Sequence, residues 1–400
     1  MTDSTPTFPA ADDSGWVRTW GASPQSPNSS VTDLDPLGNA TLWQVIRISG
    51  GGHHVRVRFS NEFGSTPITI DAAHLGIAES AVSIIEGSQR TLTFGGRSSV
   101  MIPAGAPVLS DPVELRLLGL ERLMISLYVA DRIDTVTCHG TLHALGWILP
   151  GDNTQLNTVP AGAEATEAQG LISAVEMLPE TRMHAIAVIG DSRVDGIGST
   201  PGTDRRWTDV LAERLAERGG RTRAVINQGI GGNRLLHDEI GQSALARFDR
   251  DVLATPGLEY AIISGGGNDL MMSFAARDDD SAGFLDHFPG GTVTADDVIA
   301  AHRQLADRAH AHGVRVIAAT IAPWGGADLF SDEGDRHREL VNAWIRTTGD
   351  LDGVIDFDAA WRDPARPNRL RDDLHAGDYL HGNDAGYRAL ADSIDLSLFD

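Results

Sequence analysis

The chain has 400 residues, of which 41% are apolar, and this length suits two domains better than a single core. Its 55 acidic residues outnumber 32 basic residues, all of them arginine, and the net charge of −23 argues against nucleic acid as a partner. No apolar run approaches the roughly 18 residues of a membrane span, and a single cysteine, Cys138, excludes an intrachain disulfide.

The chain begins MTDSTPTFPAADDSG, with acids where a secretory signal has basic residues followed by an apolar stretch. We therefore expect a disordered leader over residues 1–15 and a cytoplasmic location. Secretion stays open, because removal of a signal would leave the same sequence.

Short β-like runs fill the next part of the chain. The run VRVRF, Val55 to Phe59, alternates strictly between apolar and basic residues, and ITI, TLTF, SVMI, VELRL and LMISLYV come after it, between Gly, Pro, Ser and Asn. Such runs are typical of an antiparallel sandwich or barrel. We predict a β-sandwich-like domain over residues 16–176, in which GAEATEAQG, Gly162 to Gly170, belongs to the connection with the second domain.

Strand-like and helical runs alternate in the remaining part. The strand-like runs are AIAVIG, AVINQG, YAIISGGG, VRVIAATIA and GVIDFD, and RRWTDVLAERL, DVIAAHRQLADRAHAHG and RHRELVNAWIRTTG are helical. This βαβα order indicates a parallel sheet with helices on both faces. We predict an α/β domain over residues 177–400.

Polar residues follow three of these strands at the point where each ends. They are GDS at Gly190 to Ser192, NQGIGGN at Asn227 to Asn233 and GGND at Gly266 to Asp269, and a fourth group, DYLH, covers Asp378 to His381. Ligands of parallel α/β sheets bind at the carboxyl ends of the strands. We therefore expect the side chains of these groups to gather along one edge of the sheet.

Acyl transfer is the chemistry that fits these groups. The Ser192 hydroxyl becomes a nucleophile if His381 takes its proton, and Asp378 can fix the tautomer of that histidine. The backbone N–H groups of Ser192 and Gly232 and the side-chain amide of Asn268 can form an oxyanion hole. Each group alone has a simpler explanation as a turn, a helix cap or a surface residue. Their joint occurrence, in order, favours the nucleophile.

The four groups resemble those of the SGNH hydrolases, also called the GDSL family of esterases and lipases, over residues 185–399. The resemblance implies a flavodoxin-like three-layer α/β/α fold, no cofactor, and the same roles for the five residues just named. The segments TWGASP, VRVRFSNEFG and RTLTFGGRSSV are similar to a β-rich region that precedes the catalytic domain in a bacterial and fungal branch of the family.

Two residues depart from the family pattern. Arg193 stands where Leu or Ile is usual, and Gly382 stands where Pro is common. Arg193 either pairs with a local acid, such as Asp195 or Asp204, or binds substrate by selecting esters that carry an acid group.

Other enzyme and metal sites fit less well. The sequence GDSRV lacks the second glycine of G-x-S-x-G, and NQGIGGN lacks the full dinucleotide fingerprint. His139 and His143 have no evident third partner for a metal. We expect a serine esterase that acts through an acyl-enzyme on acetyl or other short-chain esters of carbohydrates or small molecules. The alternative is a non-catalytic carbohydrate-binding or scaffolding protein with a relic hydrolase domain.

Overall fold

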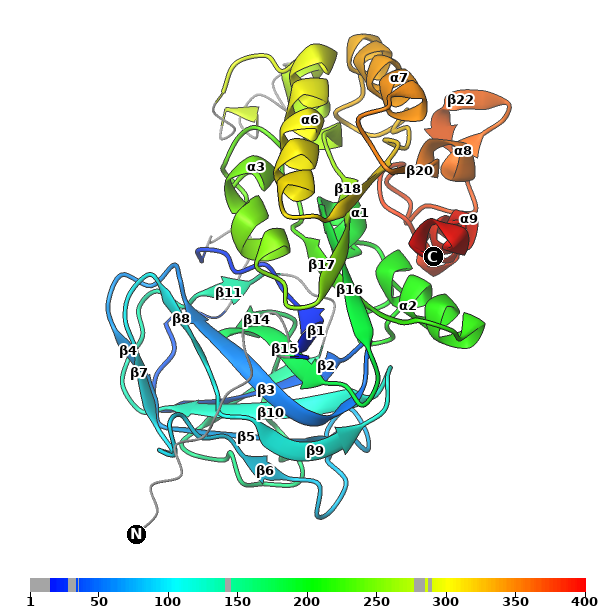
Figure 1. Cartoon of the computed structure of the whole chain (residues 1–400). Helices are drawn as coiled ribbons and strands as arrows, with labels where there is room; N and C mark the ends of the chain where they lie inside the picture. Colours follow the sequence, from blue (N-terminus) through cyan, green and yellow to red (C-terminus); the bar gives the residue numbers. More distant parts are fainter. Residues whose placement is uncertain (1–14, 28–33, 35, 141–144, 277–284, 287–289) are drawn as a thin grey trace.

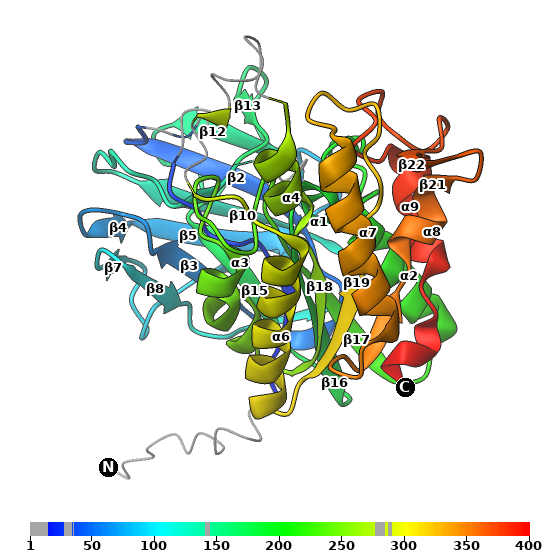
Figure 2. The same cartoon turned by 90° about the horizontal axis from the view of Figure 1, so that it is seen from above.

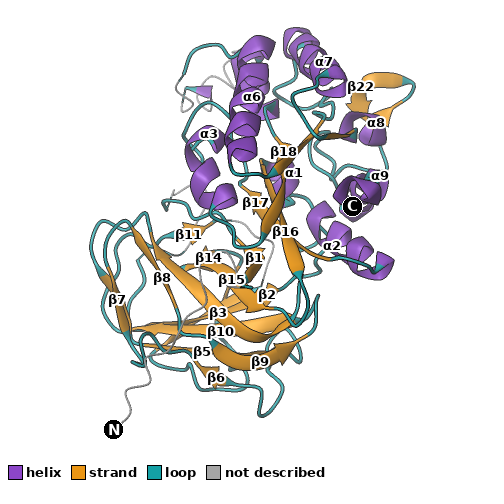
Figure 3. Cartoon of the chain, in the orientation of Figure 1, coloured by secondary structure: helices purple, strands orange, loops and turns teal. Residues whose placement is uncertain are grey.

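The computed structural model describes residues 15–27, 34, 36–140, 145–276, 285–286 and 290–400. The predicted leader lies outside these ranges, except for Gly15. A β-rich part lies beside an α/β part, as the sequence predicts, with the strands of the first part below the helices of the second in Figures 1 and 3. No helix in the described ranges is long and apolar enough to cross a membrane.

Two antiparallel sheets form most of the β-rich part. One contains β1 (Val17–Gly21), β15 (Ile172–Leu178), β3 (Gly52–Asn61) and β8 (Ala106–Leu109) in this order, and β9 (Val113–Leu117) also pairs with β3. The other has the order β13 (Glu164–Thr166), β12 (Gly146–Pro150), β2 (Ala40–Arg47), β10 (Arg122–Val129), β5 (Ala72–Ile77) and β6 (Arg90–Thr91). The short pairs β4 (Ile68–Ile70) with β7 (Val100–Ile102) and β11 (Cys138–His139) with β14 (Gln169–Gly170) complete this part.

The alternation in VRVRF sets which face of β3 is buried. Val55, Val57 and Phe59 are fully buried, whereas Arg56 and Arg58 between them are partly exposed. The apolar residues pack with Leu123, Ile125 and Leu127 of β10 in one core, because the period of two in a strand directs them all to the same side. The predicted sandwich-like core is therefore confirmed.

The α/β part is built on a parallel sheet with the order β17 (Thr222–Gly229), β16 (Met183–Gly190), β18 (Leu258–Ser264), β19 (Arg315–Ala319) and β20 (Gly353–Ile355). This is the 2-1-3-4-5 order of flavodoxin-like folds. Helices cover both faces of the sheet, as Figure 2 shows from above. They are α2 (Trp207–Arg218), α3 (Ala244–Phe248), α4 (Gly267–Phe274), α6 (Ala295–Ala311), α7 (Asp332–Thr347), α8 (Phe357–Trp361) and α9 (Asp384–Ser393).

Smaller elements connect these layers. They are α1 (Ser192–Asp195), a π-helical turn (Asp249–Leu253), the hairpin of β21 (Arg362–Asp363) and β22 (Arg366–Leu370), and a 3₁₀ turn (Leu396–Phe399). Successive residues of β16 face opposite layers: Ala187 packs with Phe248 and Leu305, whereas Val188 packs with Trp207 and Leu390. A strand buried on both faces explains the continuous apolar run AIAVIG.

The junction between the two parts differs in detail from the prediction. The predicted boundary between residues 176 and 177 falls inside β15, which pairs with β1 and β3 along its length. We propose a boundary in residues 179–182, between β15 and β16. The segment Gly162–Gly170 contains β13 and β14, so its assignment as a connection is wrong. Backbone pairing with β12 and β11 determines its structure, despite its Gly, Ala and Glu composition.

Candidate active site

The three strands that precede the polar groups end side by side. Gly190 at the end of β16 pairs in register with Gly229 of β17 and with Ser264 of β18. The GDS, NQGIGGN and GGND groups therefore begin at one edge of the sheet, as the sequence predicts.

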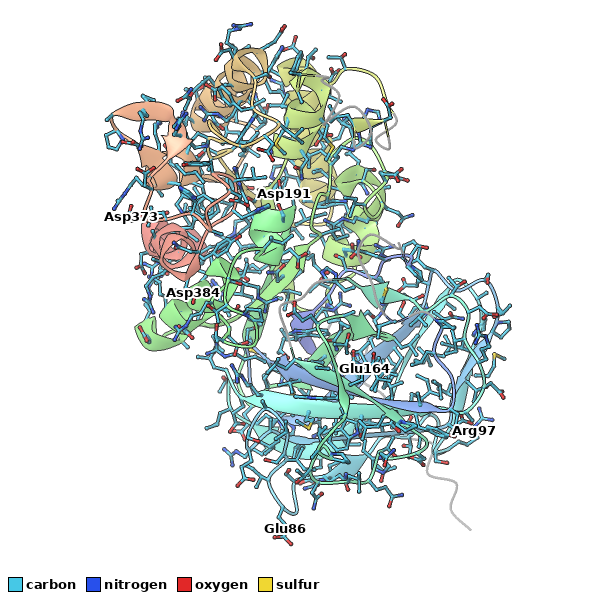
Figure 4. All side chains as sticks on the ribbon, turned by 180° about the vertical axis from the view of Figure 1, so that it is seen from behind. Glu86, Arg97, Glu164, Asp191, Asp373 and Asp384 are labelled. Atoms are coloured by element: carbon cyan, nitrogen blue, oxygen red, sulfur yellow. The ribbon has the colours of Figure 1, made fainter. Side chains whose placement is uncertain are left out.

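Ser192 begins α1, immediately after β16. The Asp191 carboxylate caps this short helix by accepting a hydrogen bond of 3.0 Å from the backbone N–H of Arg193. Burial raises the pKa of Asp191 above its usual value, although the charge of Arg193 opposes the shift. Figure 4 shows Asp191 among the side chains of the α/β part. The strand end and the cap fix the backbone of Ser192. The residue as a whole is 7% exposed.

The loop before α9 brings a histidine to this serine. His381 Nε2 lies 2.8 Å from Ser192 Oγ, and His381 Nδ1 lies 2.6 Å from Asp378 Oδ2. The other oxygen of Asp378 accepts the backbone N–H groups of Leu380 and His381, both at 2.9 Å. These contacts connect the carboxylate, the imidazole and the hydroxyl in one line of hydrogen bonds.

The same contacts keep Asp378 ionised. Partial burial opposes ionisation, but hydrogen bonds from the His381 ring and from two backbone N–H groups outweigh it, so the pKa of Asp378 lies well below its usual value. Because the carboxylate only accepts hydrogen bonds, Nδ1 of His381 carries the proton when the ring is neutral. The lone pair of Nε2 then faces Ser192.

The loop after β17 and the start of α4 contribute Gly232 and Asn268. Gly232 has a φ of +73°, and a Cβ there would lie 2.6 Å from Ile240 Cδ1, so glycine suits both the conformation and the space. Asn268 is 7% exposed and donates from Nδ2 to Asn233 O at 2.9 Å. An amide has two N–H groups, and this bond uses one of them.

Arg247 supports the site and has no signal in the sequence that we could identify. Its fully buried guanidinium donates to Gly190 O and Asn233 Oδ1, both at 3.0 Å, and to Gln228 O at 2.7 Å. It also pairs with Asp251 at 3.0 Å. One side chain thus joins the end of β16, the end of β17 and the loop that carries Gly232.

The structure corrects the predictions for Arg193. Its Nε, Nη1 and Nη2 atoms donate to the carbonyl oxygens of Leu380, Ala322 and Pro323 at 3.0, 2.8 and 3.2 Å. Of the two acids expected beside it, Asp195 contacts His139 and Asp204 pairs with Arg122. The expected role in binding acidic substrates is not supported either, because the guanidinium fork is engaged by backbone carbonyls. Arg193 instead joins α1, the helix that begins at Ser192, to the loop that carries His381.

Of the two histidines weighed as metal ligands, His143 lies outside the described residues. His139 contacts Ser23 O and the Asp195 carboxylate.

The sequence model of the GDSL-like Lipase/Acylhydrolase family matches residues 188–389, half of the chain. No curated protein shows significant similarity to this chain. A GDSL-like lipase from Bacteroides thetaiotaomicron is 16% identical over 54% of this chain and 87% of its own, with a TM-score of 0.39.

Two further solved structures are similar to the chain. A carbohydrate acetylesterase family member from Sinorhizobium meliloti is 16% identical over 53% of this chain and 95% of its own, with a TM-score of 0.40. The aryl esterase of M. smegmatis is 17% identical over 52% of this chain and 95% of its own, with a TM-score of 0.39. On the family model, the chain belongs to the GDSL-like lipase/acylhydrolase family and is a carboxylic ester hydrolase.

Proposed function

We propose that the chain is a serine esterase that acts through an acyl-enzyme formed on Ser192. The observation that carries this proposal is the line of hydrogen bonds from Asp378 through His381 to Ser192 Oγ. His381 takes the proton of Oγ as Oγ attacks the ester carbonyl carbon, and gives that proton to the leaving alcohol when the carbon–oxygen bond breaks. Asp378 holds the tautomer that leaves Nε2 free to accept.

The second half of the reaction uses the same groups. Water attacks the acyl carbon of the Ser192 ester, His381 takes a proton from this water, and Ser192 Oγ recovers a proton as it leaves. The released product is a carboxylic acid, and the enzyme returns to its starting state.

Three donors are proposed for the oxyanion that forms in each half. They are the backbone N–H groups of Ser192 and Gly232 and the Nδ2 group of Asn268. Their placement at adjacent strand ends supports this assignment. Loss of one such donor raises the barrier by roughly 3 kcal/mol in other enzymes.

We propose acetyl or other short-chain esters of carbohydrates or small molecules as substrates. A series of p-nitrophenyl esters of increasing acyl length, measured beside acetylated sugars, tests this proposal. A decline in kcat/KM from acetyl to longer acyl groups supports it, and a maximum at long chains contradicts it.

A fluorophosphonate separates this enzyme from a non-catalytic carbohydrate-binding or scaffolding protein with a relic site. The esterase binds one fluorophosphonate per chain, covalently on Ser192, and the variant Ser192→Ala binds none. A folded wild-type chain that stays unlabelled favours the non-catalytic alternative.

A further inference from the structure

A histidine of the β-rich part lies against the helix that carries Ser192. His139 belongs to β11, which Figure 1 shows at the border between the two parts. Its Nδ1 lies 2.8 Å from Ser23 O, and its Nε2 lies 3.1 Å from Oδ1 of Asp195 in α1. The His139 and Asp195 side chains are 2% and 1% exposed. The contact is therefore shielded from water on both sides.

Hydrogen-bond chemistry places an extra proton in this contact. A backbone carbonyl only accepts, so Nδ1 of His139 carries a proton and donates it to Ser23. The Asp195 carboxylate also only accepts, so the short distance to Nε2 requires a second proton between the two groups. Because an unpaired buried charge is costly, each of the two side chains depends on the other.

Asp195 also contacts the loop that carries Gly232. Its other oxygen, Oδ2, accepts the backbone N–H of Gly231 at 2.9 Å. Gly231 immediately precedes Gly232, so the direction of the Gly232 N–H depends on how the peptide before it is held. A path of hydrogen bonds thus runs from Ser23 through His139 and Asp195 to this loop.

A second group of contacts joins the same segment of the β-rich part to the loop. Ser23 Oγ donates to Gln228 Oε1 at 2.8 Å and accepts a hydrogen bond from Arg247 at 2.7 Å. Arg247 also holds Asn233 Oδ1, on the far side of Gly232. One end of the loop therefore contacts Asp195, which His139 holds, and the other end contacts Arg247, which donates to Ser23.

We propose that His139 is a positioning residue for ester hydrolysis. It holds Asp195, and through it the Ile230–Gly231 peptide, in a position that directs the next N–H, that of Gly232, toward the oxyanion. This inference rests on the proposed function, in particular on Gly232 as an oxyanion donor. It gives the β-rich part a role in turnover, in addition to any role in stability.

The test compares three variants in the full chain by kcat and KM for p-nitrophenyl acetate. A glutamine at position 139 cannot donate from two separate nitrogens, and Asp195→Ala removes the acceptor of the Gly231 N–H. We expect His139→Gln and Asp195→Ala each to lower kcat about tenfold or more, with KM changed less than about threefold. Asp195→Asn keeps kcat within about threefold, because its amide oxygen accepts from Gly231 while its amide N–H donates to neutral His139.

Glu213→Gln is the matched control. It removes an ion pair between Glu213 of α2 and Arg47 of β2, at 3.0 Å, which also joins the two parts. We expect its kcat to equal that of the wild type, since this contact does not lead to the Gly232 loop. Unfolding midpoints of all variants show which of them are folded under the assay conditions.

Wild-type kcat in folded His139→Gln or Asp195→Ala overturns the inference, and so does an equal loss of kcat in Asp195→Asn and Asp195→Ala. If His139→Gln does not fold, the two Asp195 variants decide between these outcomes. Ser192→Ala in the same assay separates the two proposals. Turnover that persists in Ser192→Ala contradicts the proposed function. An inactive Ser192→Ala beside fully active His139→Gln and Asp195→Ala contradicts only the role of His139.

Discussion

Arg193 Nε donates to Leu380 O at 3.0 Å, so the residue after the proposed nucleophile holds the residue before His381. Its other two nitrogens hold the carbonyls of Ala322 and Pro323. Arg193→Leu removes all three donors and leaves carbonyls without them, at a cost of about 1–3 kcal/mol for each buried group. We expect kcat to fall about tenfold for neutral and anionic esters alike, because the loop of His381 loosens.

The measurement for Arg193→Leu is kcat/KM for a matched pair of charged and neutral esters at fixed salt, with the unfolding midpoint as a control. Arg193→Lys provides a comparison that keeps the charge but loses the planar fork, and we expect it to lose activity as well. A loss confined to the anionic ester would restore a substrate-binding role for Arg193.

Asp378 offers a test of the histidine tautomer. In Asp378→Asn the amide oxygen can still accept from the Leu380 and His381 backbones, but the amide nitrogen then faces Nδ1 and favours the tautomer with its proton on Nε2. That tautomer cannot accept from Ser192, so we expect kcat to fall by roughly 10³ to 10⁴. Asp378→Ala costs less than His381→Ala, since water can replace an orienting acid but not the base. Equal activity of Asp378→Asn and the wild type would contradict the role of this acid.

Asn268 is the side-chain donor among the three proposed for the oxyanion. Asn268→Ala removes its amide, and we expect kcat to fall by about 10² to 10³ while KM stays near the wild-type value, because the donor acts on charge that develops in the transition state. Initial rates over a range of ester concentrations separate the two constants. A raised KM with unchanged kcat would instead assign Asn268 to substrate binding.

The buried ring of His302 makes the free energy of unfolding depend on pH. Its ring is fully buried in α6, and burial lowers its pKa to about 4, although a hydrogen bond to Val298 O opposes the shift. The unfolded ring has a pKa of about 6.5. Above this pH the ring is neutral in both states. Between about pH 6.5 and pH 4 only the unfolded chain takes up the proton. The free energy of unfolding therefore falls as the pH falls, by about 3 kcal/mol in total.

Urea unfolding at pH 7.5 and pH 4.5 measures this loss. His302→Leu cannot titrate, and we expect its free energy of unfolding to fall less between the two pH values than that of the wild type. The same fall in both proteins would contradict the neutral buried state of His302.

Local pattern was enough to predict the framework of the molecule. The alternation in VRVRF predicted a strand of an antiparallel sandwich, and the apolar run AIAVIG predicted β16, because each depends on the period of its own element. The common edge of three strand ends followed from the βαβ order alone. The two strands depend on residues that are close in sequence.

The contacts that support the site could not be predicted in the same way. Arg193 reaches carbonyls 129, 130 and 187 positions away, and His139 reaches Asp195 across the two parts of the chain. Backbone carbonyls carry no sequence signal, so nothing marked Arg193 or Arg247 as a supporting residue. The strands β13 and β14 in Gly162–Gly170 were not predicted for a related reason, since they pair with β12 and β11, which lie earlier in the chain.

The turnover of Ser192→Ala tests the central claim most directly. The hydroxyl of Ser192 is the only group of the protein that bonds to the acyl carbon in the proposed mechanism, and the substitution removes one buried oxygen without adding bulk. We expect kcat for p-nitrophenyl acetate to fall by at least about 10³, with an unfolding midpoint close to that of the wild type. A folded Ser192→Ala chain that keeps more than about a tenth of wild-type turnover would contradict the account.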